Sequence, residues 1–200
     1  MDLSGRIFVT SDTHFGDPDA VDRFGRSFRD VQEMDDRLVD EINRVVGSGD
    51  LLLHLGDFTG RLKNGRTIHA RTIRERLVCR RIILIRGNHD PKTKPAFDAL
   101  FESVHERLTF RCRDAASLSG DERIVMEHYP LRVWQGRHDG ACHLHGHAHG
   151  TIPEEGRSTD VGVDSWSLAP VELSTVIQLL KNRPVGFERI RARVQPVRKP

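Results

Sequence analysis

Long hydrophobic runs are missing from this chain of 200 residues. No apolar stretch approaches the about 18 residues that a membrane-spanning helix needs. Residues 1–12 lack the basic start and the apolar stretch of a secretory signal. These absences disfavour a membrane protein and a secreted protein, so a cytoplasmic location is expected.

Cysteine is also scarce, with only Cys79, Cys112 and Cys142 in the chain. The number is odd and no C-x-x-C pair occurs, which disfavours both a disulfide framework and a cysteine zinc site. We therefore expect three buried structural thiols.

The chain has little net charge, +2 at neutral pH. Residues 181–200 carry seven Lys and Arg against one Glu, so the preceding 180 residues sum to −4. Such a basic segment can contact nucleic acid, although a charge run is more often a solvated end of the chain. The composition is otherwise that of a globular protein. We predict one domain over residues 1–180 and a loosely ordered basic tail over residues 181–200.

The first half of the chain alternates predicted strands and helices. Apolar segments that stop at polar turns predict buried strands at residues 6–11, 50–55 and 81–85. Helical spacing predicts helices at about residues 31–46 and 67–78, the first capped by Asp30 and Glu33. This alternation is typical of βαβ units, in which ligands bind at the carboxyl ends of the strands.

The second half is richer in short strands. Turn residues separate strand candidates at residues 108–112, 123–127, 141–145 and 159–163. No internal repeat interrupts the pattern, which supports a single domain.

Polar motifs follow the predicted strands of the first half. Asp12-Thr13-His14 places two polar side chains on one side of extended backbone. Gly56-Asp57 and Gly87-Asn88-His89-Asp90 follow the next two strands, each with a glycine that permits a tight turn. One such Asp is usually a turn former or a helix cap. Three in succession predict a ligand site.

Histidines continue this pattern in the second half. His128 follows the predicted strand 123–127, and Gly146-His147-Ala148-His149 follows 141–145. Imidazole, carboxylate and amide ligands without thiolate suit Mn, Fe, Zn or similar ions better than calcium. A single structural zinc would use fewer and softer ligands.

The ordered series D-x-H, G-D, G-N-H-D, H and G-H-x-H resembles the calcineurin-like metallophosphoesterases over residues 6–165. The longer strings around Asp12, Asp57, His128 and His147 resemble a small, stand-alone microbial and phage-type branch. This resemblance implies an α/β fold, a four-layer αββα sandwich of two mixed sheets flanked by helices.

The resemblance also implies two divalent cations, with Mn expected and Fe, Zn, Ni, Co and Mg as alternatives. One cation would be bound by Asp12, His14, Asp57 and His149. The other would be bound by Asp57, Asn88, His128 and His147, so that Asp57 bridges both. In such a site a hydroxide between the metals attacks phosphorus directly.

Further roles are implied for residues beside the ligands. In the family, His89 stabilises charge or protonates the leaving oxygen, and Asp90 would orient His89 or its loop. Arg26 resembles a branch arginine that could bind a substrate phosphate, and the alternative is an exposed arginine at a helix entry. His54 and His145 match the branch and are expected to support the ligands.

Some positions depart from the family pattern. The branch usually has His where this chain has Asp17, and a smaller residue where it has Glu127. We expect the residues at these two positions, Asp17 and Glu127, to affect substrate preference. Protein phosphatases carry G-D-x-x-D-R-G, whereas Gly60 stands here in place of the second Asp. A protein phosphatase is therefore disfavoured.

We expect hydrolysis of phosphodiester or phosphomonoester bonds in small, nucleotide-like substrates. A nuclease or a nucleic-acid end-processing phosphatase is the alternative among enzymes, favoured by the basic tail. A non-catalytic scaffold of the same fold is disfavoured, because seven residues fill all eight ligand positions. Membrane contact is not expected, and the oligomeric state stays open.

Overall fold

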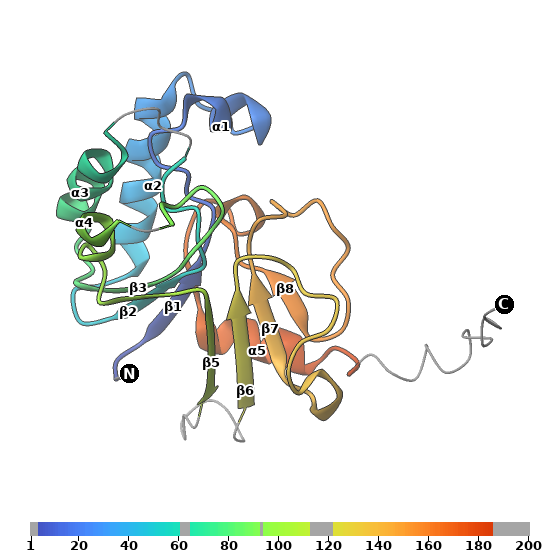
Figure 1. Ribbon diagram of the computed structural model, residues 1–200. Coiled ribbons are helices and arrows are strands. Elements are labelled where there is room, and N and C mark those ends of the chain that lie inside the picture. Colours follow the sequence, from blue (N-terminus) through green and yellow to red (C-terminus); the bar gives the residue numbers. More distant parts are fainter. Residues whose placement is uncertain (1–3, 61–64, 93, 113–121, 186–200) are drawn as a thin grey trace, which may run out of the picture.

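The computed structural model describes residues 4–60, 65–92, 94–112 and 122–185, which form two β-sheets and their helices (Figure 1). The strand order is β4-β3-β2-β1-β9 in the first sheet. Its strands are β1 (Ile7–Thr10), β2 (Leu51–His54), β3 (Arg81–Ile85), β4 (Ser103–His105) and β9 (Val171–Glu172). All pairs are parallel except β1 with β9.

The second sheet has the order β5-β6-β7-β8. Its strands are β5 (Arg107–Cys112), β6 (Glu122–Glu127), β7 (Cys142–His145) and β8 (Ser158–Asp160). Only β5 and β6 are antiparallel. The predicted α/β fold of two mixed sheets flanked by helices is thus confirmed.

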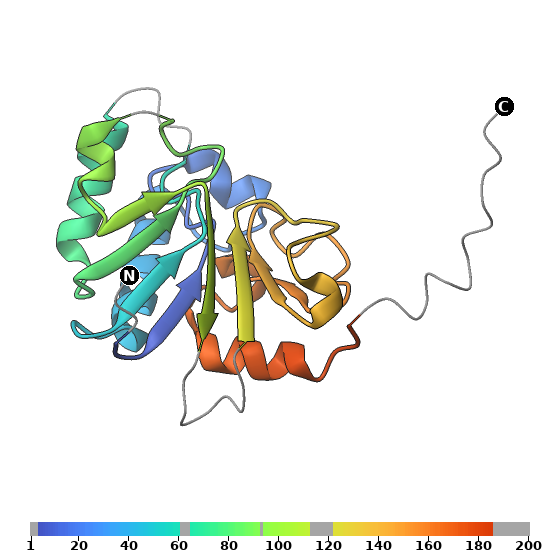
Figure 2. The same ribbon diagram turned by 60° about the horizontal axis from the view of Figure 1, so that its bottom comes forward.

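The described helices flank the sheets. They are α1 (Pro18–Arg23), α2 (Val31–Val45), α3 (Arg66–Arg76), α4 (Pro95–Asp98) and α5 (Leu173–Lys181), with short 3₁₀ helices η1 (Arg137–Asp139) and η2 (Val163–Ser165). Helices α2, α3 and α4 cover one face of the first sheet, and α5 runs along the lower edge of both sheets (Figure 2). None of these helices is long and apolar enough to cross a membrane.

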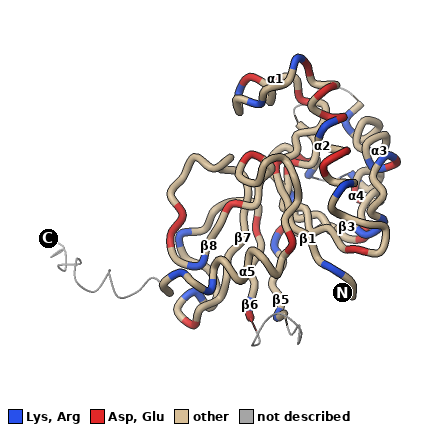
Figure 3. The backbone as a smooth tube through the Cα atoms, turned by 180° about the vertical axis from the view of Figure 1, so that it is seen from behind, with Lys and Arg blue, Asp and Glu red and all other residues tan. Residues whose placement is uncertain are grey.

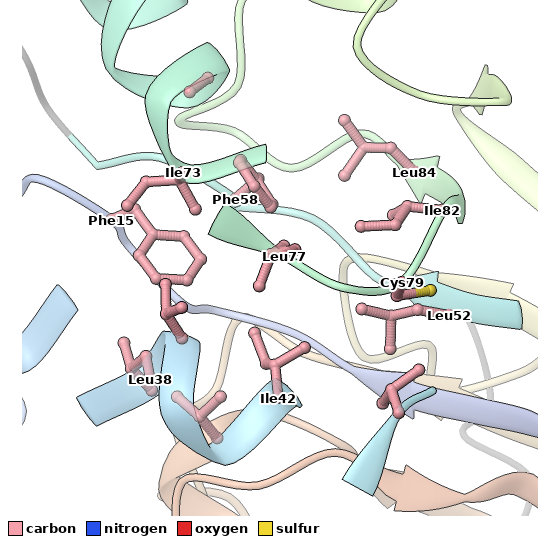
Figure 4. Packing of buried hydrophobic residues seen from close by; sticks show 14 of the residues in the cluster. Phe15, Leu38, Ile42, Leu52, Phe58, Ile73, Leu77, Cys79, Ile82 and Leu84 are labelled. Carbon is pink, nitrogen blue, oxygen red and sulfur yellow. The ribbon is translucent and has the colours of Figure 1, made fainter. Parts of the chain in front are cut away.

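The alternation of side chains along the strands builds two cores. In β2, Leu52 faces the helices, whereas Leu51 and Leu53 face the second sheet. Figure 4 shows Leu52 near Ile42 and Leu77 in the helix-side core. Parallel strands covered on both faces need apolar residues at successive positions, which is why β1 to β3 read as continuous apolar runs.

Helix α2 begins as the sequence predicts. The Asp30 side chain accepts a hydrogen bond from the Glu33 amide at 2.9 Å, as expected of an N-cap. The Glu33 side chain accepts a hydrogen bond from the Arg29 amide at 2.7 Å. The predicted capping arrangement would instead have it accept from the Asp30 amide. Helix α3 ends at Arg76, two residues earlier than predicted, because Leu77 has extended backbone.

Besides the two 3₁₀ helices, five described elements were not predicted from the sequence: α1, α4, α5, β4 and β9. Four of them are short, and α5 is an amphipathic helix whose Leu173, Val176, Ile177 and Leu180 are buried between the sheets. The predicted strand 159–163 is shorter, since β8 ends at Asp160 and η2 begins at Val163. Of the predicted tail, residues 186–200 lie outside the described residues.

The cysteines behave as expected. Cys79, Cys112 and Cys142 are all buried and free. Burial raises the pKa of the Cys142 thiol to about 11, so it stays protonated and serves as an apolar side chain in the core.

Replacing Leu53 with Ala should lower the free energy of unfolding by about 2–5 kcal/mol, because the cavity would open between two packed sheets. Urea denaturation measures this change. Ile68→Ala is the matched control, since that side chain is 73% exposed and should cost little. Equal losses in the two variants would mean that Leu53 does not pack as described.

Candidate metal centre

The polar motifs meet where strands of the two sheets end. Strands β1, β2 and β3 run parallel and in register, so Asp12, Asp57 and Asn88 follow them at the same edge of the first sheet. The backbone joins the loops directly, since the Asp12 amide donates to the Gly56 carbonyl at 3.0 Å. From the second sheet, the Gly146 amide donates to the His128 carbonyl at 3.0 Å.

Asp12, His14 and His149 form the first cluster, in which the ligand atoms lie within 4.8 Å of one another. Nε2 of His14 and Nε2 of His149 each lie 3.9 Å from Oδ1 of Asp12. Oδ1 of Asp12 and both ring nitrogens of His14 are buried and have no hydrogen-bond partner among the described residues. Buried polar atoms without partners suit a cation.

Asp57, His128 and His147 form the second cluster, again within 4.8 Å. Oδ2 of Asp57 lies 3.5 Å from Nε2 of His128 and 3.6 Å from Nε2 of His14. This oxygen therefore faces both clusters. Oδ1 of Asn88 lies 3.0 Å from Nε2 of His128, so the amide joins the second cluster. All seven predicted ligands are thus brought together.

Five of these seven residues have left-handed backbone. The φ angles are 58° at Asp12, 51° at His14, 53° at Asp57, 67° at His147 and 49° at His149. Such conformations cost about 1–3 kcal/mol each, and they persist where the surrounding structure fixes them. The ligand loops are therefore held in shape by contacts outside the ligands themselves.

Asp90 supplies several of these contacts. Its carboxylate accepts hydrogen bonds from the amides of Asp57, Phe58 and Gly87, at 2.9, 3.0 and 2.9 Å. Burial raises the pKa of Asp90 to about 7, although these amides oppose the shift. The side chain binds two ligand loops together, which favours the loop-orienting role over direct catalysis.

Gly87 is required for this approach of the two loops. A Cβ atom there would lie 2.2 Å from Oδ1 of Asp57. The same oxygen accepts a hydrogen bond from the His89 amide at 2.7 Å. Only Oδ2 of Asp57 is thereby left to face the two clusters.

The protonation of the centre follows from burial and neighbouring charges. Burial raises the pKa of Asp12 to about 6 and lowers that of His14 to about 2, so His14 is a neutral imidazole. Burial would also raise the pKa of Asp57, but the hydrogen bond and charge of His128 bring it to about 2. The pKa of His128 rises to about 9, because Asp57 and Asp12 outweigh its burial.

Two histidines are oriented through their second nitrogen. Nδ1 of His128 donates to the Leu55 carbonyl at 2.8 Å, which turns Nε2 toward Asp57. Nδ1 of His149 lies 2.7 Å from Oδ2 of Asp164, which turns Nε2 toward Asp12. Partners of this kind fix the tautomer and ring orientation of metal-binding histidines.

Arg26 anchors the Asp164 carboxylate. Its Nε and Nη2 bind the two Asp164 oxygens at 2.8 and 2.9 Å. Nη2 also donates to the Asp12 carbonyl at 2.6 Å, and Nη1 donates to the Thr13 carbonyl at 3.0 Å. One guanidinium thus links His149, through Asp164, to the loop that carries Asp12.

These contacts bear on both sequence interpretations of Arg26. The side chain is 6% exposed, so it is not an exposed arginine at a helix entry. Because Nη1 also lies 3.4 Å from Sδ of Met34, all five donors of the guanidinium have partners inside the protein. The phosphate-binding role stays a prediction, and the observed contacts hold the loop that carries Asp12.

His89 lies between the clusters and solvent. Its ring is 5.0 Å from that of His14, and its Nε2 is 3.9 Å from Oδ2 of Asp57. The side chain remains 10% exposed. His89 belongs to neither cluster described above, but its ring lies with His14 and Asp17 in a third group whose possible ligand atoms are within 4.8 Å of one another.

The two residues that depart from the family pattern contact other groups of the protein. Oδ1 of Asp17 caps helix α1 by accepting from the Asp19 amide at 3.1 Å, and Oδ2 lies 3.8 Å from Nδ1 of His14. The Asp17 carboxylate is buried and is not turned outward. Glu127 accepts a hydrogen bond from Nε of Arg107 at 2.5 Å, which balances its charge.

The remaining predicted histidines support the loops. Nε2 of His54 lies 3.0 Å from Oγ1 of Thr13, and that hydroxyl donates to the Phe58 carbonyl. His145 lies on the outer face of the second sheet, where its Nδ1 is 3.0 Å from the Gly146 carbonyl oxygen. Trp134 is 6% exposed and its Nε1 donates to the Ala141 carbonyl, so its ring is packed inside the protein.

The donor set of the clusters fits divalent cations. Imidazoles, buried carboxylates and one amide oxygen converge, and Oδ1 of Asp12 and both ring nitrogens of His14 have no hydrogen-bond partner among the described residues. This combination suits first-row ions such as Mn, Fe or Zn.

Comparison with known proteins places the fold and site in a family. The model of the calcineurin-like phosphoesterase family matches residues 5–173. An uncharacterized protein of Methanocaldococcus jannaschii, MJ1445, is 27% identical over 187 residues, which cover 90% of this chain and 94% of that protein.

Solved structures provide a second comparison. The crystal structure of AQ665, a protein of unknown function from Aquifex aeolicus, superposes with a TM-score of 0.62 at 22% identity, covering 87% of this chain and 98% of that one. This likeness concerns the fold. A predicted phosphoesterase from Streptococcus pneumoniae gives a TM-score of only 0.35, at 19% identity over 78% of this chain and 70% of that one.

The seven converging ligands, the two mixed sheets and the family match agree. The chain belongs to the calcineurin-like phosphoesterase family. It is accordingly a metal-dependent hydrolase of phosphate esters, and its His and Asp clusters are its candidate metal sites.

Replacing Asp164 with Asn should weaken metal binding at the first cluster by about 10–100-fold, because His149 loses the charged partner of Nδ1. Metal titration followed by calorimetry measures this affinity directly. Asp36→Asn, which removes an exposed carboxylate on α2, is the control and should bind metal as the unmodified protein does. Unchanged affinity in Asp164→Asn would contradict the positioning role.

Proposed function

We propose that the protein hydrolyses phosphodiester or phosphomonoester bonds of small, nucleotide-like substrates with two divalent cations, Mn being favoured. The observation that carries the proposal is the position of Asp57, whose Oδ2 lies 3.6 Å from His14 and 3.5 Å from His128. One carboxylate oxygen between two ligand sets supports a pair of ions that share it.

The chemistry divides between the cations and the chain. Two bound divalent cations lower the pKa of water and withdraw charge from a phosphoryl group. Asp12, Asp57 and the histidines hold them, and Asp90 and Arg26 fix the loops that carry these ligands. His89, beside the ligands and partly exposed, donates a proton to the leaving oxygen. Water attacks phosphorus directly, without a covalent intermediate on the chain.

A small substrate is favoured over duplex nucleic acid by the charge distribution. Acidic and basic residues are interspersed over the described elements, without one broad basic face in the view from behind (Figure 3). A duplex-binding protein needs such a face. Nucleic-acid contact through the basic tail remains a prediction, because residues 186–200 lie outside the described chain.

Removing metal tests the mechanism. EDTA should abolish hydrolysis of a nitrophenyl phosphodiester, and added Mn should restore it, because the nucleophile depends on the cations. Asp57→Asn should lose occupancy of both metals, as measured by elemental analysis, since its carboxylate serves both clusters. Full turnover in metal-free protein, or two ions per chain in Asp57→Asn, would contradict the proposal.

His89→Ala separates proton donation from metal binding. The variant should retain both ions and lose about 10²–10⁴-fold in kcat, as expected when a general acid is removed. The loss should be small for a nitrophenolate leaving group, which departs without a proton, and large for a ribose alkoxide. Equal losses for both substrates would indicate that His89 stabilises phosphoryl charge instead.

A further inference from the structure

Arg137 is a buried cation away from the ligand clusters. It is 7% exposed and begins η1, between Gly136 and Gly140, whose φ angles are 76° and 87°. The turn is closed by a hydrogen bond of 3.0 Å from the Ala141 amide to the Gly136 carbonyl. The chain therefore folds tightly around this guanidinium.

Few protein groups balance its charge. Nη1 donates to the Arg132 carbonyl at 2.6 Å, and the guanidinium lies 5.0 Å from the Trp134 ring centroid. Nε is buried without a partner, and no carboxylate of the described chain forms an ion pair with Arg137. Buried charges are ordinarily paired, because an unpaired one loses its hydration without compensation.

Arg26 provides the comparison within the same molecule. Both arginines are buried to a similar degree, at 6% and 7% exposure. Arg26 uses all five donors inside the protein and is held by both oxygens of Asp164. Among the described residues, Arg137 has one such acceptor, the Arg132 carbonyl.

A pocket that is partly open to solvent lies beside Arg137. It has a volume of about 200 Å³, well above the about 30 Å³ that one water molecule occupies in the liquid. Its walls include apolar side chains and a few polar ones, among them Leu131, Trp134, Arg137, His145, Ile152 and Ser158. The buried Arg137 side chain thus lines a pocket large enough for a small ligand.

The acidic residues on the cavity wall are occupied or exposed. Glu154 accepts hydrogen bonds from Thr159 and the Asp160 amide and pairs with Arg183. Glu155 is exposed to solvent, as is Arg132 on the same wall. Neither glutamate forms an ion pair with Arg137.

From the unpaired guanidinium and the adjoining cavity, we infer that Arg137 forms an anion site that binds a phosphate group. The planar guanidinium fork matches phosphate oxygens, and Ser158 on the same wall offers a hydroxyl group. The apolar wall of Leu131 and Ile152 suits the carbon skeleton attached to that phosphate.

The site adjoins the segments that carry metal ligands. Leu131 follows His128 closely and is tied to the sheet by its amide, which donates to Nε2 of His143 at 3.0 Å. His145 on the cavity wall precedes Gly146-His147. This placement fits either a second phosphate of the substrate, an assignment that rests on the proposed function, or free inorganic phosphate.

Calorimetric titration of EDTA-treated protein with inorganic phosphate tests the site without the metal centre. The unmodified protein should bind phosphate, and Arg137→Met should weaken binding by about 10–100-fold, as expected for lost charge-assisted hydrogen bonds. Arg137→Lys keeps the charge without the fork and should fall between them. Arg71→Met makes the same change on the exposed surface of α3 and should bind normally.

Thermal unfolding separates this role from a structural one. Without phosphate, Arg137→Met should melt at the same temperature as the unmodified protein or higher, because an unpaired buried charge is removed. A clearly lower Tm, no phosphate binding by the unmodified protein, or equal binding by Arg137→Met would overturn the inference. If Arg137→Met does not fold, the titration of Arg137→Lys decides, with undiminished affinity counting against the site.

Kinetics with the Mn-loaded protein then identify the source of the phosphate. A substrate phosphate predicts that Arg137→Met raises KM about tenfold for a nucleoside 3′,5′-bisphosphate and leaves KM for the 5′-monophosphate unchanged. Free phosphate predicts that both KM values stay the same. Because the titration needs no turnover, phosphate binding without any hydrolysis would refute the proposed function and retain the anion site.

Discussion

The arrangement of the whole centre depends on keeping the Asp57 carboxylate buried between two groups of histidines. Its Oδ1 is held by the His89 amide and its own amide by Asp90, so Oδ2 is aimed with little freedom. A carboxylate in that position needs nearby positive charge, which His128 supplies in the metal-free protein through a pKa of about 9. The strands of two sheets end at this place, and Gly87 lets the loops approach closely. Together with the loop contacts, they bring the histidines to Oδ2 of Asp57.

Much of this architecture could be predicted from the sequence, because the residues that define it are local. Strands β1 to β3 are buried on both faces, which produces unbroken apolar runs in the sequence, and β3 has the predicted bounds. Each ligand follows a strand by one or a few residues, so the strand ends also locate the ligands. Helix α5 was missed although its apolar spacing is helical, and β4 and β9 are too short for a periodic pattern to emerge.

The supporting residues were harder to predict, because their roles come from pairing across the chain. Asp164 belongs to no motif, and its partner Arg26 lies 138 positions earlier. Arg26 itself was recognised, but its role was inferred from residue type, and only the hydrogen-bond partners distinguish an anchor from a phosphate-binding group. The same limit applies to Arg137, because an absent counter-ion leaves no trace in sequence spacing.

The left-handed backbone at five ligand positions limits how this centre could change during evolution or in the laboratory. Asp, Asn and His adopt that conformation several-fold more readily than most residues, whereas β-branched residues rarely do. An exchange of Asp12 or His147 for a bulkier or softer ligand would therefore have to overcome backbone geometry as well as coordination chemistry. Altered metal preference is more accessible through neighbours that orient a ligand, such as Asp164. The backbone conformation of the loops thus restricts which residue types can replace the ligands. It places no such restriction on the residues around them.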